Sequence, residues 1–233
     1  MNKNSNTYII LYASIMVIIV AAGLSYGPNV RIEKMGDILR SVGQGKGADT
    51  ASDKATYIAE QYQKYIVDSY AVDAAGNRVD GADAFNLLIN LKAEYDKPQA
   101  ERRLPVFVSR DDQGKTSYVI PIWGKGLWGP IWGYIALADD WDTVNGAVFD
   151  HKSETPGLGA EIASSGFQAQ FRGKHILDST GRVVAIAVEK GGADPNGSAC
   201  GGRPFGRNVD LSRSRGYAEK LPGRLRSLYS TAT

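Results

Sequence analysis

The feature that most limits the fold of this chain is an uncharged apolar run near its N-terminus. No Asp, Glu, Lys or Arg occurs from Tyr8 to Tyr26, and about 20 apolar residues are enough for a helix to cross a bilayer. A cleaved secretory signal is the alternative, but the run is longer than the apolar part of most signals, and only Lys3 precedes it. We therefore expect a retained transmembrane helix in residues 1–28. Basic residues flank the run on both sides, so the positive-inside rule does not decide its orientation.

Apolar residues at helical spacing predict an amphipathic helix in residues 30–42. A glycine-rich break follows from Gly43 to Asp49, and helical spacing resumes from Ala55 to Val67. We expect residues 29–54 to form a helix and a linker, with the helix either packing on the following domain or continuing the anchor. The residues that give the first helix its apolar face are Ile32, Met35, Ile38 and Leu39.

The middle of the chain is rich in predicted strands. A helix is predicted from Gly159 to Arg172, and a further strand from Arg182 to Glu189. Short turns separate the main strands, which favours antiparallel pairing over parallel pairing through crossover helices. We therefore expect an α+β domain over residues 55–190, with an antiparallel sheet and flanking helices. The β-branched and aromatic runs that predict the main strands are 104–109, 116–123 and 131–138.

Composition argues against two classes of site. A zinc site is not expected from the single Cys200 and two histidines. Residues 197–233 contain seven Lys and Arg and two acidic residues. The whole chain has a net charge of +2, so the rest of it has a net charge of about −3. The basic residues of that tail lie in a Gly- and Ser-rich stretch without interleaved aromatics, so we predict no nucleic-acid binding.

Two segments are candidates for ligand binding. The first is Gly-Lys-Gly-Leu-Trp-Gly-Pro at 124–130, whose glycines between two strands allow backbone to approach a flat ligand closely. An ordinary glycine-rich turn with Trp128 in the core is the alternative. The second is His-Lys-Ser-Glu-Thr-Pro-Gly-Leu-Gly at 151–159, where free backbone N–H groups at a helix start would face a ligand. Here the alternative is that Thr155 caps a helix whose first residue is Pro156, with no ligand.

The apolar run, the 124–137 stretch and the 151–159 stretch together resemble the C subunit of the Na+-translocating NADH:quinone reductases, as far as about Lys190. The motif His-x-x-Glu-Thr-Pro-Gly-Leu-Gly also occurs in the G subunit of the ferredoxin:NAD ion-translocating complexes, so it identifies the FMN-binding domain family. Gly-Leu-Trp-Gly at 126–129 favours the quinone reductase. The G subunit and a flavin-free structural subunit are the alternatives.

The resemblance implies a single-pass protein of the bacterial inner membrane, with its main domain on the extracytoplasmic side. It implies FMN as a one-electron carrier between neighbouring subunits, without a nucleophile or general base from this chain. The implied partners are the other subunits of the reductase and a flavin transferase that attaches FMN to a threonine. The residues expected to line the flavin are Gly126, Leu127, Trp128, His151, Glu154, Thr155, Gly157 and Leu158.

The threonine motif of the family, Asp-Gly-x-Ser-Gly-Ala-Thr-x-Thr, is absent from the chain as written. When Gly201 to Ser212 are back-translated and read one base later, the first and third bases of each new codon come from the written residues. Only the middle base is free, and the codons permit Val-Asp-Gly-Leu-Ser-Gly-Ala-Thr-Leu-Thr-Ser. We therefore interpret residues 191–233 as an aberrant tail that follows a frameshift between about Lys190 and Gly201.

Overall fold

The computed structural model describes residues 29–178 and, beyond them, residues 181, 183, 184, 186, 188, 189, 192 and 193. The predicted anchor in residues 1–28 and the chain beyond residue 193 lie outside the described residues. Among the residues described, no helix combines the length and apolar character that a membrane span requires.

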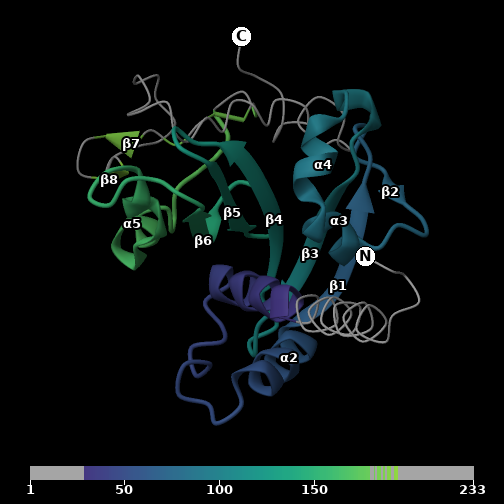
Figure 1. The fold of residues 1–233 in the computed structure, drawn as a ribbon. Coiled ribbons are helices and arrows are strands. Elements are labelled where there is room, and N and C mark those ends of the chain that lie inside the picture. The colour runs from purple at the N-terminus through teal and green to yellow at the C-terminus, as the bar shows by residue number, and fades with distance from the viewer. Residues whose placement is uncertain are drawn as a thin grey trace, which may run out of the picture.

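A six-stranded antiparallel sheet in the order β2-β1-β3-β4-β5-β6 forms the centre of the domain (Figure 1). The three predicted strands are present as β3, β4 and β5, and the prediction of an antiparallel α+β domain is confirmed. The β4–β5 ladder is the longest. It begins where Tyr118 pairs with Leu137 and ends where Lys125 pairs with Pro130. The strands are β1 (Ile66–Val72), β2 (Arg78–Val79), β3 (Leu104–Arg110), β4 (Thr116–Lys125), β5 (Pro130–Leu137) and β6 (Val144–His151); β7 (Val188–Glu189) and β8 (Gly192–Ala193) pair separately.

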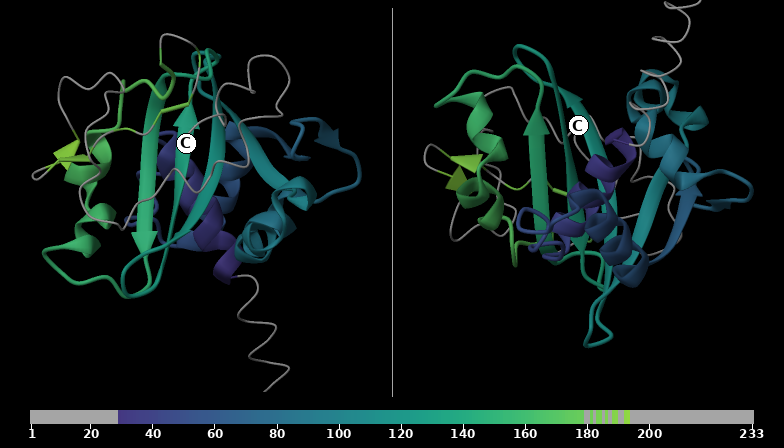
Figure 2. Two further views of the ribbon diagram at one scale, coloured as in Figure 1. Left: turned by 90° about the horizontal axis from the view of Figure 1, so that it is seen from above. Right: turned by 60° about the horizontal axis from the view of Figure 1, so that its bottom comes forward.

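Helices pack on both faces of the sheet. Residues 29–41 are helical, and this segment crosses in front of the strands in the right-hand view of Figure 2. Its Ile38 is fully buried in one cluster with Phe107, Val119 and Tyr134 of the sheet. The helix predicted at residues 30–42 therefore supplies part of the core. The other helices are α2 (Lys54–Tyr65), α3 (Ala84–Ile89), α4 (Leu91–Asp96) and α5 (Ser165–Ala169), with short 3-10 helices η1 (Gln99–Glu101) and η2 (Gly159–Ala163).

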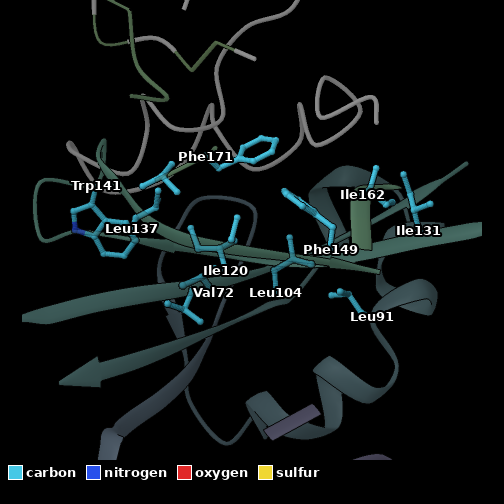
Figure 3. Close-up of a cluster of buried hydrophobic side chains, with 13 residues drawn as sticks. Val72, Leu91, Leu104, Ile120, Ile131, Leu137, Trp141, Phe149, Ile162 and Phe171 are labelled. Atoms are coloured by element: carbon cyan, nitrogen blue, oxygen red, sulfur yellow. The ribbon is translucent and has the colours of Figure 1, made fainter. Parts of the chain in front are cut away.

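Consecutive residues of a strand point to opposite faces of the sheet. Val119 belongs to the cluster beneath the 29–41 helix, whereas Ile120 belongs to a second cluster on the other face. In this second cluster Phe149 contacts Phe171 edge-on at 5.0 Å between ring centroids (Figure 3). The sheet is therefore covered on both faces.

Three secondary-structure predictions need correction. The helix predicted to reach Val67 ends at Tyr65, because the following residues pair with β3 from Ile66 onward. The helix predicted from Gly159 to Arg172 is two short helices, since Ser164 has extended backbone and caps α5. Strands β1 and β6 were not predicted. Within the strand predicted at 182–189, the structure describes a bridge from Val183 to Leu177 and the pair of residues that form β7.

The 29–41 helix buries a carboxylate against the sheet. Asp37 is 3% exposed and pairs with Arg40. Burial raises the pKa of Asp37 from 3.8 to about 6, against the opposing effect of Arg40 and Lys34. In the unfolded chain Asp37 ionises near 3.8, so folding takes up a proton between pH 3.8 and 6. Burial of the protonated Asp37 carboxyl therefore costs little below pH 3.8, and the free energy of unfolding decreases as the pH rises from 3.8 to about 6.

Replacing Asp37 with Asn should stabilise the domain at pH 8, because the amide has no charge to desolvate. The shift in pKa from 3.8 to about 6 corresponds to a gain of about 2 to 3 kcal/mol in the free energy of unfolding. At pH 4 the variant and the parent should differ little. Urea unfolding at the two pH values measures this difference. An Asn variant that is less stable at pH 8 would show that the Arg40 ion pair outweighs the cost of burial.

Candidate functional site

The two predicted ligand-binding segments lie at the same end of the sheet. The turn between β4 and β5 is closed by the Gly126 N–H, which donates to the Gly129 carbonyl at 2.7 Å. On the other side of β5, His151 at the end of β6 pairs with Ile131. Because β5 pairs with both β4 and β6, the 124–130 hairpin and the 151–159 loop become neighbours.

A buried carboxylate joins the two segments. Glu154 is 5% exposed, and its Oε1 accepts the backbone N–H of Trp128 at 2.9 Å. Two further bonds run alongside: the Ser153 hydroxyl donates to the Trp128 carbonyl at 2.9 Å, and the Lys152 N–H donates to the Pro130 carbonyl at 3.0 Å. The hairpin is therefore held in one position by three hydrogen bonds between it and the loop.

Two glycines of the hairpin are required by this close approach. A Cβ at Gly126 would lie 2.3 Å from Glu154 Oε1, and a Cβ at Gly129 would lie 2.4 Å from the Ser153 hydroxyl oxygen. Both separations are far inside van der Waals contact, so any larger residue would push the two segments apart. Sequence reasoning did not single out Ser153 or Gly129, although both lie inside the two motifs.

His151, the first residue of the loop, accepts a hydrogen bond from within the loop. Its Nδ1 lies 3.2 Å from the Glu154 N–H, which donates to it. In the neutral ring the proton therefore sits on Nε2. His151 is half-buried, and its contact with the Glu154 backbone places it in the same hydrogen-bonded unit as the hairpin.

The predicted helix start at Thr155 and Pro156 is wrong. The Thr155 carbonyl accepts the N–H groups of Leu158 and Ala160, each at 3.1 Å, and the Gly157 N–H donates to Glu161 Oε1 at 3.2 Å. Gly157 has a φ of 72°, so the chain makes a left-handed turn here, and η2 begins only at Gly159. The N–H groups expected to face a ligand are thus largely used within the loop.

Three large apolar side chains of this hydrogen-bonded unit are exposed. Leu127 is 64% exposed, Trp128 67% and Leu158 73%. The alternative that Trp128 belongs to the core is therefore wrong. Large apolar side chains held out on a rigid support are suited to a flat aromatic ligand or an apolar partner surface. Within the described part of the chain, no cluster of His, Cys, Asp and Glu has the arrangement of a metal site.

The chain is similar to proteins of one family. The family model described as FMN-binding domain matches residues 126–201. The C subunit of the Na(+)-translocating NADH-quinone reductase of Haemophilus ducreyi is 30% identical over 199 residues, 79% of this chain and 76% of that protein. The corresponding protein of Vibrio anguillarum is 32% identical over 206 residues, 82% of this chain and 77% of that protein.

Two crystal structures share the fold. One is the C subunit of the Na(+)-translocating NADH-quinone reductase from Parabacteroides distasonis, with a TM-score of 0.60 and 32% identity over 87% of this chain and 90% of that one. The other is NqrC of Shewanella oneidensis, with a TM-score of 0.58 and 25% identity over 71% of this chain and 79% of that one.

Proposed function

This chain belongs to the C-subunit family of the Na+-translocating NADH-quinone reductases, and from this premise we propose that it is the FMN-carrying, membrane-anchored subunit of such a complex. In this role it passes single electrons between neighbouring subunits while NADH reduces quinone and Na+ is exported. The bound FMN supplies the redox chemistry, and the protein supplies its position and surroundings. The other subunits of the reductase are its partners.

The main support for flavin binding is the hydrogen-bonded unit formed by the hairpin and the loop. Its exposed Leu127, Trp128 and Leu158 offer apolar surface to a flat ring system. The absence of a side chain at Gly126 lets the hairpin backbone come close to the loop. Glu154 holds the hairpin through the Trp128 N–H, so the aromatic side chain starts from a fixed backbone position. These residues bind and orient the ring and exclude water from it.

Covalent attachment does not fit the chain as written. Family resemblance places FMN on a threonine in the Ser-Gly-Ala-Thr motif, which a flavin transferase would modify. The family model match ends at residue 201, the position from which the shifted frame permits that motif. We propose that a frame-restored chain carries the flavin covalently, and that the written chain lacks the attachment site.

The anchored location rests on the apolar run in residues 1–28. The relatives belong to a reductase named for Na+ translocation, a process that requires a membrane. We propose a single-pass protein of the bacterial inner membrane with its folded domain on the extracytoplasmic side. The relatives described above are C subunits of the quinone reductase, which favours this assignment over the G subunit of the ferredoxin-linked complexes.

The proposed role can be tested in membranes that hold the rest of the reductase but lack its C subunit. A frame-restored chain should re-establish NADH-dependent quinone reduction. Gly126→Ala in that chain should lower the rate at least tenfold, because its Cβ would strike Glu154. Gly124→Ala is the matched control, since its Cβ would lie 3.6 Å from Ile131, an ordinary contact. Full activity without bound flavin would instead establish the alternative of a structural subunit.

A further inference from the structure

A cavity of about 210 Å³ lies between the 29–41 helix, the α3–α4 region and strands β4 and β5, and it borders the hairpin at Pro130. Its walls are mainly apolar and aromatic, with Leu88 and Leu91 on the helical side and Trp123 and Trp132 on the strands. A water molecule takes up about 30 Å³ in the liquid. The cavity therefore has room for a group several times the size of a water molecule, such as a small headgroup.

Two ammonium groups line this cavity. The Lys34 Nζ lies 5.2 Å from the centre of the Trp132 ring, and the Lys92 Nζ lies 5.8 Å from the centre of the Trp123 ring. Lys92 also pairs with Asp96 at 2.6 Å, but both side chains are more than half exposed. Such a surface pair is weak and is screened by salt. An anion of the ligand would thus meet two positive charges, each partly offset by a nearby carboxylate, Lys34 by Asp37 and Lys92 by Asp96.

The cavity also lies close to the proposed membrane anchor. Lys34 is five residues into the 29–41 helix, which corresponds to about 8 Å along its axis. The uncharged run ends at Tyr26, and the three Cα steps from there to residue 29 span at most about 11 Å. Lys34 consequently lies within roughly 20 Å of the end of the span.

Lysine stems with tryptophan rings are the usual side chains at the level of lipid headgroups. The rim of the cavity adds Ile89, which is 43% exposed. We propose that this cavity, the Lys34–Lys92 groove, binds the headgroup region of an anionic phospholipid. The lipid phosphate pairs with Lys34 and Lys92, and the glycerol backbone packs on the two tryptophans. Bound lipid would hold the domain at a fixed angle to the membrane. The inference rests on the anchor of the proposed function.

The test uses the full chain in detergent micelles with equal amounts of phosphatidylglycerol and phosphatidylcholine, and counts lipid adducts by native mass spectrometry. The parent chain should retain one phosphatidylglycerol. Lys34→Gln with Lys92→Gln should lower the ratio of the two lipids about tenfold or more, since each lysine near an anionic surface contributes about fivefold. The matched control is Lys46→Gln with Lys54→Gln, which removes two lysines outside the groove and should leave the ratio unchanged.

A variant that should strengthen lipid binding distinguishes a specific loss of binding from a loss caused by misfolding. Asp96→Asn releases Lys92 from its partner and should raise the preference for phosphatidylglycerol. The proposal would be overturned if the parent chain bound the two lipids equally. It would also be overturned if replacing both Lys34 and Lys92 left the ratio of bound phosphatidylglycerol to phosphatidylcholine unchanged. Displacement of the lipid by millimolar inorganic phosphate would also overturn it, because the groove would then be a phosphate site. If the prediction of a transmembrane anchor is wrong, alkaline carbonate should release the chain from membranes, and this result is independent of the lipid measurement.

Discussion

Restoring the shifted frame from residue 201 should convert this chain from one that never carries covalent FMN to one that does. The two chains share residues 1–200, so they have the same hairpin, the same loop and the same buried Glu154. They differ in whether Ser-Gly-Ala-Thr is present for a flavin transferase. In the written tail the nearby hydroxyls, among them Ser198 and Ser212, lack that motif.

The arginines of the written tail do not replace this attachment. Arg203 and Arg207 attract phosphate electrostatically, but a few charges in a Gly- and Ser-rich stretch bind weakly and are screened by salt. Any flavin held in this way should be lost during denaturation. Covalently attached flavin withstands denaturation, so the difference between the two chains is all or none.

Both chains are co-expressed with a flavin transferase and separated on a denaturing gel, where bound flavin fluoresces. The restored chain should fluoresce and the written chain should be dark. Replacing the threonine of Ser-Gly-Ala-Thr by alanine in the restored chain provides the matched control and should abolish the signal. Fluorescence from the written chain would place the attachment elsewhere, and a dark restored chain would contradict covalent flavin in this protein.

The full-length chain should stay with the membrane in alkaline carbonate, whereas a chain that begins at Gly27 should remain in the supernatant. Carbonate removes proteins that are held at the surface by charge but not a helix whose backbone is satisfied within the bilayer. The shortened chain keeps the 29–41 helix and its buried Ile38. Loss of the membrane form then reports on the apolar run and not on an unfolded domain.

A full-length variant with Ile15→Asp and Ile18→Asp tests the same run without changing the length. Each aspartate at the centre of a span costs about 3 kcal/mol on insertion, so the doubly substituted chain should be released. The mass of the mature N-terminus distinguishes a retained anchor from a cleaved signal. A mature chain that has lost Tyr8 to Tyr26 would support the signal.

Several expectations for this protein come from local sequence alone, and those for the central strands are confirmed. The uncharged run predicts an anchor because the thickness of a bilayer sets the length of a span. Strands β3, β4 and β5 follow from β-branched and aromatic runs between turns. The two candidate segments were also visible as motifs, since glycines and a carboxylate occur there at short spacing. All of these signals lie within short, continuous stretches of the chain.

Other features depended on partners distant in sequence. The helix predicted to include Ile66 ends at Tyr65 because Ile66 pairs with Ser109 in β3, far along the chain. Such pairing outweighs the weak intrinsic preferences of single residues. The same applies to Asp37, whose raised pKa comes from burial of its helix against the sheet.

The candidate site shows this division within a few residues. Sequence alone identified Trp128 and Glu154 as candidates but left open whether Trp128 was buried. Only the pairing of β5 with both β4 and β6 brings the hairpin to the loop, where Glu154 is buried beneath the Trp128 backbone and the indole remains exposed. A motif specifies which chemical groups are available, whereas burial and contact depend on which strands are neighbours, because hydrogen bonding across a sheet joins residues that are far apart along the chain.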